Sequence, residues 1–263
     1  MSETAVKTIP VDAGGLLIGS GRPKICIPLV GKDLQEIKEQ IGLVLQAYPD
    51  IVEWRADMFE GILDEAQRSE ALETISYLLG GVPILFTFRS HFEGGNKEIT
   101  AEEYSLLNVW ASRRKEIAMI DIEGRRGDFV PKDLVKLIHA DGKPVITSAH
   151  FLDSTPSAEK MADILRELDA AEGDVLKLAV MPSEAQDVLN LMQATLWMCK
   201  ETPHPVVTMA MGKLGVVSRL SGSLTGSSMT FSTAGDASAP GQLPAEIVRD
   251  ILEQLDGLQG AEE

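Results

Sequence analysis

The chain has 263 residues, of which 44% are hydrophobic, and a formal net charge of −16 at pH 7. This length and composition are typical of a soluble globular protein with one large α/β domain or two small ones. The acidic balance argues against a nucleic-acid partner, because phosphate binding needs a basic face and the sequence has no basic run. The acidic balance does not exclude a small anionic ligand bound by a few local arginines.

Signals for secretion and for membrane insertion are missing from the sequence. Residues 1–10 contain no basic segment followed by an apolar one, and no apolar run approaches the roughly eighteen residues of a membrane span. The two cysteines, Cys26 and Cys199, lie far apart without metal-like or redox-like spacing. We therefore expect a cytoplasmic protein that has no membrane partner and no metal.

Short apolar runs typical of strands alternate with amphipathic segments along the chain. Residues 6–11 and 16–18, separated by Gly14 and Gly15, predict a small β-hairpin within residues 1–22. Apolar residues at helical spacing fill most of the intervals between the later runs. Eight further strands are predicted at 24–30, 50–55, 83–88, 117–122, 144–149, 173–182, 205–211 and 227–231.

Several helix starts are marked by local signals. Residues 100–103 form a capping box, Pro131 suits a first helical turn, and Thr155-Pro156 and Pro244 each precede an amphipathic run. Eight strands alternating with eight helices within one domain of residues 1–263 predict a (β/α)8 TIM barrel. An open doubly wound sheet is the alternative, since alternation alone does not establish closure. Nucleotide-binding glycine motifs are missing.

A single lysine, Lys177, stands in the middle of the apolar strand at 173–182. Burying an ammonium without a partner is costly, so the side chain either reaches a polar cavity or loses its charge. A neutral, desolvated amine is what an enzyme needs to attack a carbonyl and form a Schiff base. The alternative is a lysine whose stem packs while its head reaches the rim of the sheet.

Polar residues gather where the predicted strands end, which is where TIM barrels carry their chemistry. His150 is the best candidate for acid–base work because histidine titrates near neutrality. Glu53 and Arg55 form a pair that is either structural or catalytic, and Asp121 and Glu123 are either partners of the site or solvated caps. Arginine, serine and glutamine later in the chain can bind a carboxylate and hydroxyls. The full set of candidates from these strand ends and loops is Glu53, Arg55, Arg89, Glu93, His150, Arg219, Ser238 and Gln242.

Taken together, the motifs resemble those of type I 3-dehydroquinate dehydratase. The resemblance extends from about residue 24 to the last helix, and the motifs occur in the family's order. They are Glu53-Trp54-Arg55, Phe86-Thr87-Phe88-Arg89, His150 with Thr155-Pro156, Lys177-Leu178-Ala179-Val180-Met181-Pro182, Met209-x-Met211-x-Lys213-x-Gly215-x-x-Ser218-Arg219, and Ser238-Ala239-Pro240-Gly241-Gln242.

This resemblance implies a shikimate-pathway lyase that converts 3-dehydroquinate into 3-dehydroshikimate by syn loss of water through an imine. It implies Lys177 as the Schiff-base lysine, His150 as the proton shuttle, and Glu53 as the group that orients His150. Arg219 would hold the substrate carboxylate. Arg55, Arg89, Ser238 and Gln242 would bind hydroxyls or the carboxylate, with Glu93 nearby in its loop. The resemblance also implies a homodimer. The lysine inside the barrel, the histidine on the neighbouring strand and a carboxylate able to orient it already fit imine catalysis that needs no metal or organic cofactor.

One departure and two alternatives accompany the resemblance. After its histidine the family commonly has an acidic and then an aromatic residue, whereas this chain has Phe151-Leu152-Asp153, which could change how the site is covered. A class I aldolase would use the same lysine and would need a phosphate site, for which residues 222–228 offer glycines and serines. A barrel without catalysis that serves as a binding subunit is the other alternative.

Overall fold

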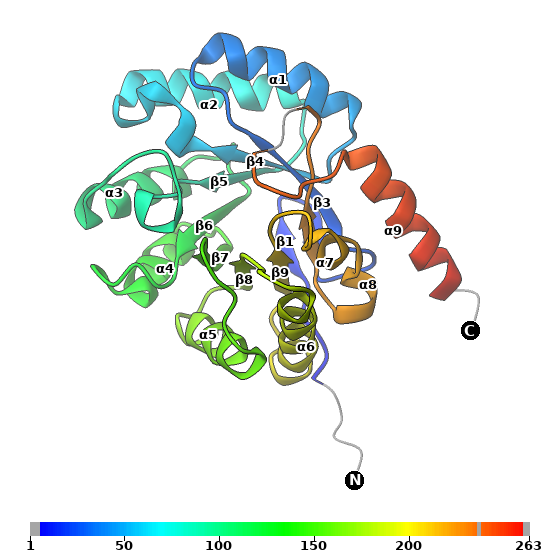
Figure 1. Cartoon of the computed structure of the whole chain (residues 1–263). Helices are drawn as coiled ribbons and strands as arrows, with labels where there is room; N and C mark the ends of the chain where they lie inside the picture. The colour runs from blue at the N-terminus through cyan, green and yellow to red at the C-terminus, as the bar shows by residue number, and fades with distance from the viewer. Residues whose placement is uncertain (1–5, 236–237, 260–263) are drawn as a thin grey trace.

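Eight parallel strands form one sheet that curls around a central axis, with helices on its outer side (Figure 1). The computed structural model describes residues 6–235 and 238–259. The strand order is β10-β3-β4-β5-β6-β7-β8-β9. A parallel bridge between Val206 of β9 and Ser227, just before β10, closes the sheet, and the amide of Ser228 donates to the carbonyl of Val206 at 2.8 Å. The predicted (β/α)8 barrel is confirmed, and the open doubly wound sheet is not what forms.

The barrel strands lie within a few residues of their predicted positions. Each is short and mostly apolar, as strands buried on both faces are. Their bounds are β3 (Lys24–Leu29), β4 (Ile51–Arg55), β5 (Ile84–Thr87), β6 (Met119–Glu123), β7 (Val145–Phe151), β8 (Val175–Val180), β9 (Val206–Ala210) and β10 (Met229–Phe231).

Helices connect the strands and cover the outside of the sheet. The α-helices are α1 (Leu34–Gln46), α2 (Glu65–Leu79), α3 (Ala101–Ser112), α4 (Pro131–Ala140), α5 (Ala158–Ala170), α6 (Ala185–Glu201), α7 (Val216–Leu220), α8 (Gly222–Thr225) and α9 (Ala245–Gln259). Three 3₁₀ turns, η1 (Ala56–Met58), η2 (Glu60–Leu63) and η3 (His91–Glu93), follow β4 and β5. Within residues 6–235 and 238–259, no helix has the length and apolar character needed to cross a membrane.

Alternation of side chains along each strand divides the core in two. Outward residues of the sheet pack against α1 to α4 and α9 in one cluster and against α5 and α6 in another. Inward residues, among them Met119, Val175 and Met229, fill the barrel interior. Because successive side chains of a strand point to opposite faces, a polar residue on the inward set faces the barrel axis. This geometry brings the polar strand ends together.

The N-terminal hairpin closes the end of the barrel where the strands begin. Strand β1 (Val11–Ala13) pairs antiparallel with β2 (Leu16–Ile18), and Gly14 and Gly15 turn the chain with positive φ angles of 66° and 93°. Ala13 and Ile18 are fully buried among the interior residues. The hairpin is confirmed, but its first strand was predicted at 6–11. Residues 6 and 9 instead donate their amides to the carbonyls of residues 200 and 203.

One predicted helix start is also wrong. Helix α5 begins at Ala158 and is capped by Ser157, rather than at Thr155-Pro156. Thr155 donates its hydroxyl to the carbonyl of Met181 at 2.8 Å, so it ties the loop after β7 to the end of β8. The capping box at residues 100–103 and the start of α4 at Pro131 are confirmed.

Candidate active site

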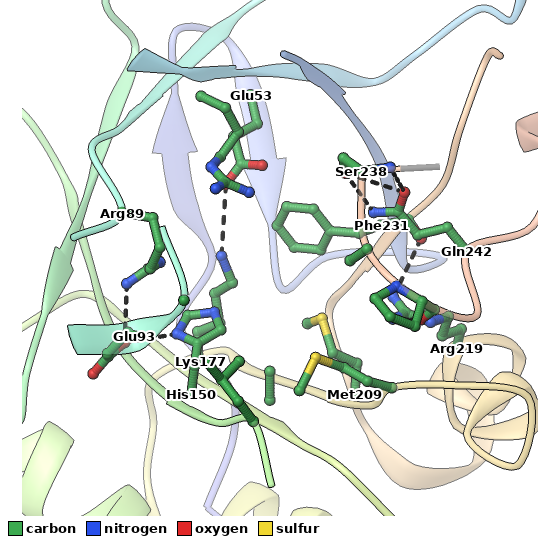
Figure 2. A pocket seen from close by; sticks show the side chains of 17 residues that line it. Glu53, Arg89, Glu93, His150, Lys177, Met209, Arg219, Phe231, Ser238 and Gln242 are labelled. Carbon is green, nitrogen blue, oxygen red and sulfur yellow. Dashed lines mark hydrogen bonds and ion pairs between the residues drawn. The ribbon is translucent and has the colours of Figure 1, made fainter. Parts of the chain in front are cut away.

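A cavity of about 180 Å³ opens at the carboxyl ends of the barrel strands, and Figure 2 shows its lining. All nine residues that the sequence singled out for the site line it, although they come from β4, the segment after β5, β7, β8, α7 and the segment after β10. The other lining residues were not assigned a role beforehand. They are Gly94, Leu152, Ala179, Met209, Met211, Phe231, Ala239 and Pro240.

Lys177 lies at the floor of this cavity with its side chain almost fully buried. It sits on β8 opposite Ser148 of β7, and only 3% of the residue is exposed. Its Nζ is 2.8 Å from Oδ2 of Asp121 and 3.7 Å from Oε1 of Glu53. The amine also lies 4.4 Å from the ring centroid of Phe231. The side chain therefore ends inside the barrel, so the alternative of a lysine that reaches the rim is wrong.

Asp121 is the direct partner of the lysine and is itself fully buried. Burial favours a protonated carboxyl, but Arg89 and Lys177, together with hydrogen bonds from Lys177 and Ser148, bring the pKa of Asp121 below its usual value. Ser148 donates its hydroxyl to Oδ1 at 2.6 Å, and Nη2 of Arg89 approaches the same oxygen at 2.8 Å. Asp121 is thus an ionised partner of the site and not a solvated cap.

The carboxylate beside His150 is Glu93, not Glu53. Nδ1 of His150 lies 2.7 Å from Oε2 of Glu93, which η3 folds back over the cavity (Figure 2). Glu53 instead accepts a hydrogen bond of 2.9 Å from the hydroxyl of Thr87 and faces Lys177. The expectation that Glu53 orients His150 is wrong for this structure. Glu53 and His150 both line the cavity, but Glu53 extends toward the amine.

Burial shapes the protonation of the His150–Glu93 pair. It raises the pKa of Glu93 to about 8, with Glu123 and Asp121 adding to the rise while Arg89 and Lys177 oppose it. Burial likewise lowers the pKa of His150 well below its usual value, and the cations Arg89, Lys177 and Arg55 lower it further. Desolvation therefore disfavours an imidazolium–carboxylate pair at neutral pH. The imidazole is neutral in the resting site.

Arg89 is surrounded by acceptors at the centre of the polar network. Besides Asp121, its guanidinium contacts Glu93 at 3.0 Å, Ser148 at 3.1 Å and Glu123 at 3.4 Å. Only 4% of the residue is exposed, although it lines the cavity. Its contacts make it the common cation of three buried carboxylates. A substrate that bound Arg89 would share it with these groups.

On the opposite side of the cavity, Arg219 of α7 lies beneath the segment that follows β10. Its Nη atoms lie 3.4 Å from the carbonyl oxygens of Phe231 and Pro240, and its Nε is buried without a hydrogen-bond partner among the described residues. Burial lowers the pKa of Arg219 to about 10, so it remains a cation at neutral pH. Ser238 and Gln242 hydrogen-bond to each other beside it. This side of the cavity offers a positive charge and amide and hydroxyl groups.

Apolar walls complete the cavity, and sequence reasoning gave them no role. Met209 lies on β9, Met211 directly follows that strand, and Phe231 ends β10. Leu152, in the segment that departs from the family pattern, packs on Gly94, where an added Cβ would come within 2.6 Å of the leucine. Met209 and Met211 are two residues apart, and this strand spacing predicts that both side chains point to the same face. The contact of Leu152 with Gly94 depends instead on how two loops meet.

Comparison with known proteins gives one consistent result. The sequence model of the family described as Type I 3-dehydroquinase matches residues 25–259. A 3-dehydroquinate dehydratase of Bacillus licheniformis is 42% identical over 246 residues, which cover 93% of this chain and 97% of the relative. The chain belongs to the type I 3-dehydroquinase family. A 3-dehydroquinate dehydratase of Klebsiella pneumoniae is also 42% identical, over 94% of this chain and 99% of the relative.

The fold agrees with solved members of this family. The crystal structure of the type I 3-dehydroquinate dehydratase from Clostridium difficile, described with covalent modified comenic acid, superposes with a TM-score of 0.91 at 37% identity. The match covers 95% of this chain and 99% of that chain. The resemblance drawn from the motifs is therefore confirmed along nearly the whole chain.

Proposed function

We propose that this chain converts 3-dehydroquinate into 3-dehydroshikimate and water, through an imine between the substrate and Lys177. Membership of the type I 3-dehydroquinase family supports the reaction. The observation that carries the mechanism is the position of Lys177, whose amine ends inside the cavity, 2.8 Å from Asp121, and the His150–Glu93 pair lines the same cavity (Figure 2). The chain is then a hydro-lyase of the shikimate pathway.

Imine formation begins at the amine of Lys177. Asp121 accepts a hydrogen bond from the ammonium and is positioned to take its proton, which frees the lone pair of the amine to attack the substrate carbonyl. The resulting carbinolamine loses its hydroxyl as water, with the proton returned by Asp121, and a protonated imine remains. The carboxylates of Asp121 and Glu53 lie 2.8 and 3.7 Å from Nζ, so they stabilise the positive charge that the imine retains.

His150 moves the proton that dehydration requires. The protonated imine draws electrons from the adjacent carbon, and a neutral imidazole can take the proton from that carbon as a general base. The electrons then expel the hydroxyl one carbon further on, and the same imidazole delivers the proton to it, so that water leaves. Hydrolysis of the conjugated imine consumes one water, releases the enone and restores the lysine. Glu93 holds the imidazole ring through Nδ1 at 2.7 Å.

Substrate binding falls to the cationic and amide groups around the cavity. 3-Dehydroquinate carries one carboxylate and several hydroxyls. The guanidinium of Arg219 contacts carbonyl oxygens and, within the part of the chain that the structure describes, forms none of the ion pairs that hold Arg55 and Arg89. Its charge is therefore available to a ligand, and we assign it the substrate carboxylate. Arg55, Ser238 and Gln242 line the same cavity and are assigned to the hydroxyls. Arg89 supports the catalytic side through Glu93 and Asp121.

The two alternatives lose their support. A class I aldolase of phosphorylated sugars needs a phosphate site at the cavity, yet residues 222–228 contribute nothing to the lining of the cavity among the described residues. A barrel without catalysis has no need of a buried amine, a paired imidazole and an ionised aspartate converging on one cavity. Family membership agrees with the dehydratase and with neither alternative.

We further propose that residues 1–263 form a single barrel domain that assembles as a homodimer in the cytoplasm. The unbroken sheet from β3 to β10 supports the single domain. The family resemblance supports the dimer, and the two free cysteines, Cys26 and Cys199, agree with a reducing compartment. Light scattering of the purified protein tests the dimer, since a mass of one 28.5 kDa chain would overturn it. Fractionation of the source cells with an antibody tests the compartment.

The reaction itself is tested by following the conjugated enone in the ultraviolet after 3-dehydroquinate is added to the purified protein. The proposal requires a rise in absorbance proportional to enzyme concentration, in the presence of a metal chelator as well as in its absence. Lys177→Ala serves as the control for contaminating activity from the expression host. Loss of the enone signal in the wild-type protein, or an equal signal from Lys177→Ala, would refute the proposed reaction.

A further inference from the structure

A fully buried carboxylate lies next to the active site without lining it. Asp57 belongs to η1, two residues after Arg55 at the end of β4, and none of its surface is exposed. The side chain accepts four hydrogen bonds, which come from two separate segments of the chain. A buried charge that is so completely coordinated has a definite structural task.

The first of these segments is Arg55 itself. Nε and Nη2 of Arg55 donate to the two oxygens of Asp57 at 2.8 and 2.9 Å, in the bidentate geometry that fixes a guanidinium plane. Nη1 and the second hydrogen of Nη2 are then left for a ligand in the cavity that Arg55 lines. Without the carboxylate, the side chain would regain rotamer freedom and the cavity would lose a positioned donor.

The second segment is the loop that follows β5. The amide of Arg89 reaches Oδ1 of Asp57 at 3.3 Å, and the amide of Asn96 reaches Oδ2 at 3.1 Å. These two amides approach one carboxylate because the loop folds back tightly at Gly95, where a Cβ would lie 1.8 Å from the carbonyl oxygen of Arg89. The loop between them carries Glu93.

We propose that Asp57 is a positioning residue for the dehydratase reaction, which holds Arg55 toward the substrate and fixes the loop that carries Glu93. This inference rests on the proposed function. Lys97 reinforces the same junction, since its ammonium donates to the carbonyl oxygens of Asp57 and Phe59. Burial alone would raise the pKa of Asp57, but the hydrogen bonds and charge of Arg55, with the amides of Asn96 and Arg89, lower it. The carboxylate is therefore ionised when it holds Arg55.

The test compares Asp57→Asn with a matched control. Arg126 and Asp128 repeat the same arrangement, a bidentate pair two residues apart, at a place that does not contribute to the cavity. Asp57→Asn keeps the shape of the side chain but turns a donor toward groups that are themselves donors. We expect KM for 3-dehydroquinate to rise on the order of tenfold or more, because loss of one charge-assisted contact has about that effect. Asp128→Asn leaves KM within twofold of the wild type.

A double mutant separates positioning from general damage. If Asp57 acts through Arg55, then Asp57→Asn adds less than a further twofold to the KM of an Arg55→Ala variant. The remaining effect on the Glu93 loop is read in the pH profile of kcat, which shifts in Asp57→Asn and not in Asp128→Asn. Thermal unfolding shows whether the variant is folded at the assay temperature. If it is not, Asp57→Glu, which keeps the charge but moves the carboxylate, is measured by the same criteria.

Two results would overturn the inference. One is a KM for Asp57→Asn within twofold of the wild type. The other is a full rise in KM that persists unchanged in the Arg55→Ala background, because the effect would then not pass through Arg55. Wild-type turnover in the same assay tests the proposed function independently. Its absence would refute that function, whereas normal wild-type turnover with an unaltered Asp57→Asn variant would refute only the role of Asp57.

Discussion

Replacing Glu93 by glutamine should abolish the principal pH dependence of the enzyme. Glu93 and His150 are 2.7 Å apart and buried, so their titrations are coupled and the pair gains or loses protons as a unit. Burial raises the pKa of Glu93 to about 8 and lowers that of His150. Below about pH 8 the pair therefore holds two protons: the protonated Glu93 donates to Nδ1, and the neutral ring carries its own proton on Nε2. Only the form with one proton, in which Nδ1–H donates to the Glu93 carboxylate, leaves Nε2 free to act as a base.

The size of the effect follows from these values. With a pKa of about 8, roughly one pair in ten is in the one-proton form at pH 7 and about nine in ten at pH 9. The kcat/KM of the wild type should therefore rise about tenfold between pH 7 and pH 9. Glutamine can still accept a hydrogen bond from Nδ1, but it removes a charge-assisted bond that is worth about 1.5–3 kcal/mol when the imidazole is protonated. The maximum rate should fall by about 10- to 150-fold.

The assay is the rate of enone formation from pH 6 to pH 9.5 for the wild type and for Glu93→Gln, at constant ionic strength. The wild type should show a rising limb centred near pH 8, and the variant should lack that limb because one of the coupled groups no longer titrates. A wild-type profile that is flat across this range would contradict the reasoning. So would a Glu93→Gln variant with an unchanged limb, since the titrating group would then lie elsewhere.

Further expectations concern the remaining charged groups of the site. His150→Ala should slow turnover by about 10²–10⁴-fold yet still form a borohydride-trapped adduct, as mass spectrometry would show. Glu53→Gln should retain the rising pH limb because Glu53 faces Lys177 rather than His150, and a lost limb would contradict this. Arg219→Ala should raise KM far more than it lowers kcat in steady-state kinetics. The pKa of Glu93 is about 8 in the folded state and near 4.5 in the unfolded state, so the folded state holds its proton more tightly. This contribution to stability is complete below pH 4.5 and is lost as pH rises through the folded pKa of about 8. The Tm of the wild type should therefore fall relative to that of Glu93→Gln between about pH 5 and pH 8 and change little above pH 8, as calorimetry would measure.

The barrel was predictable because its evidence lies in local patterns. Each barrel strand is a short apolar run followed by an amphipathic helix, and both periodicities are visible without tertiary information. Lys177 could be identified for the same reason, since a single charge in a strand buried on both faces conflicts with its surroundings. The hairpin boundary was less predictable. Residues 6–10 resemble a strand by composition, but the amides of residues 6 and 9 donate to carbonyls near the end of α6 instead.

Assignment of the carboxylate beside His150 failed because it depends on a loop. Glu53 lies within a strand, so its inward direction follows from alternation, and it does face the site. Glu93 lies in η3, where the path of the chain is set by Gly94, at a φ of 82°, and by the close fold at Gly95. No sequence periodicity encodes where such a turn places a side chain. The role of Asp57 was missed for the same reason, because half of its hydrogen bonds come from this loop.

Borohydride trapping tests the central claim most directly. The purified protein is incubated with 3-dehydroquinate, reduced, digested and analysed by mass spectrometry, with Lys177→Ala treated in parallel. An imine at Lys177 predicts one stable adduct on the peptide that contains β8, and no adduct in the variant. An adduct at another residue, an adduct that survives in Lys177→Ala, or turnover without any trapped adduct would contradict imine catalysis by this lysine.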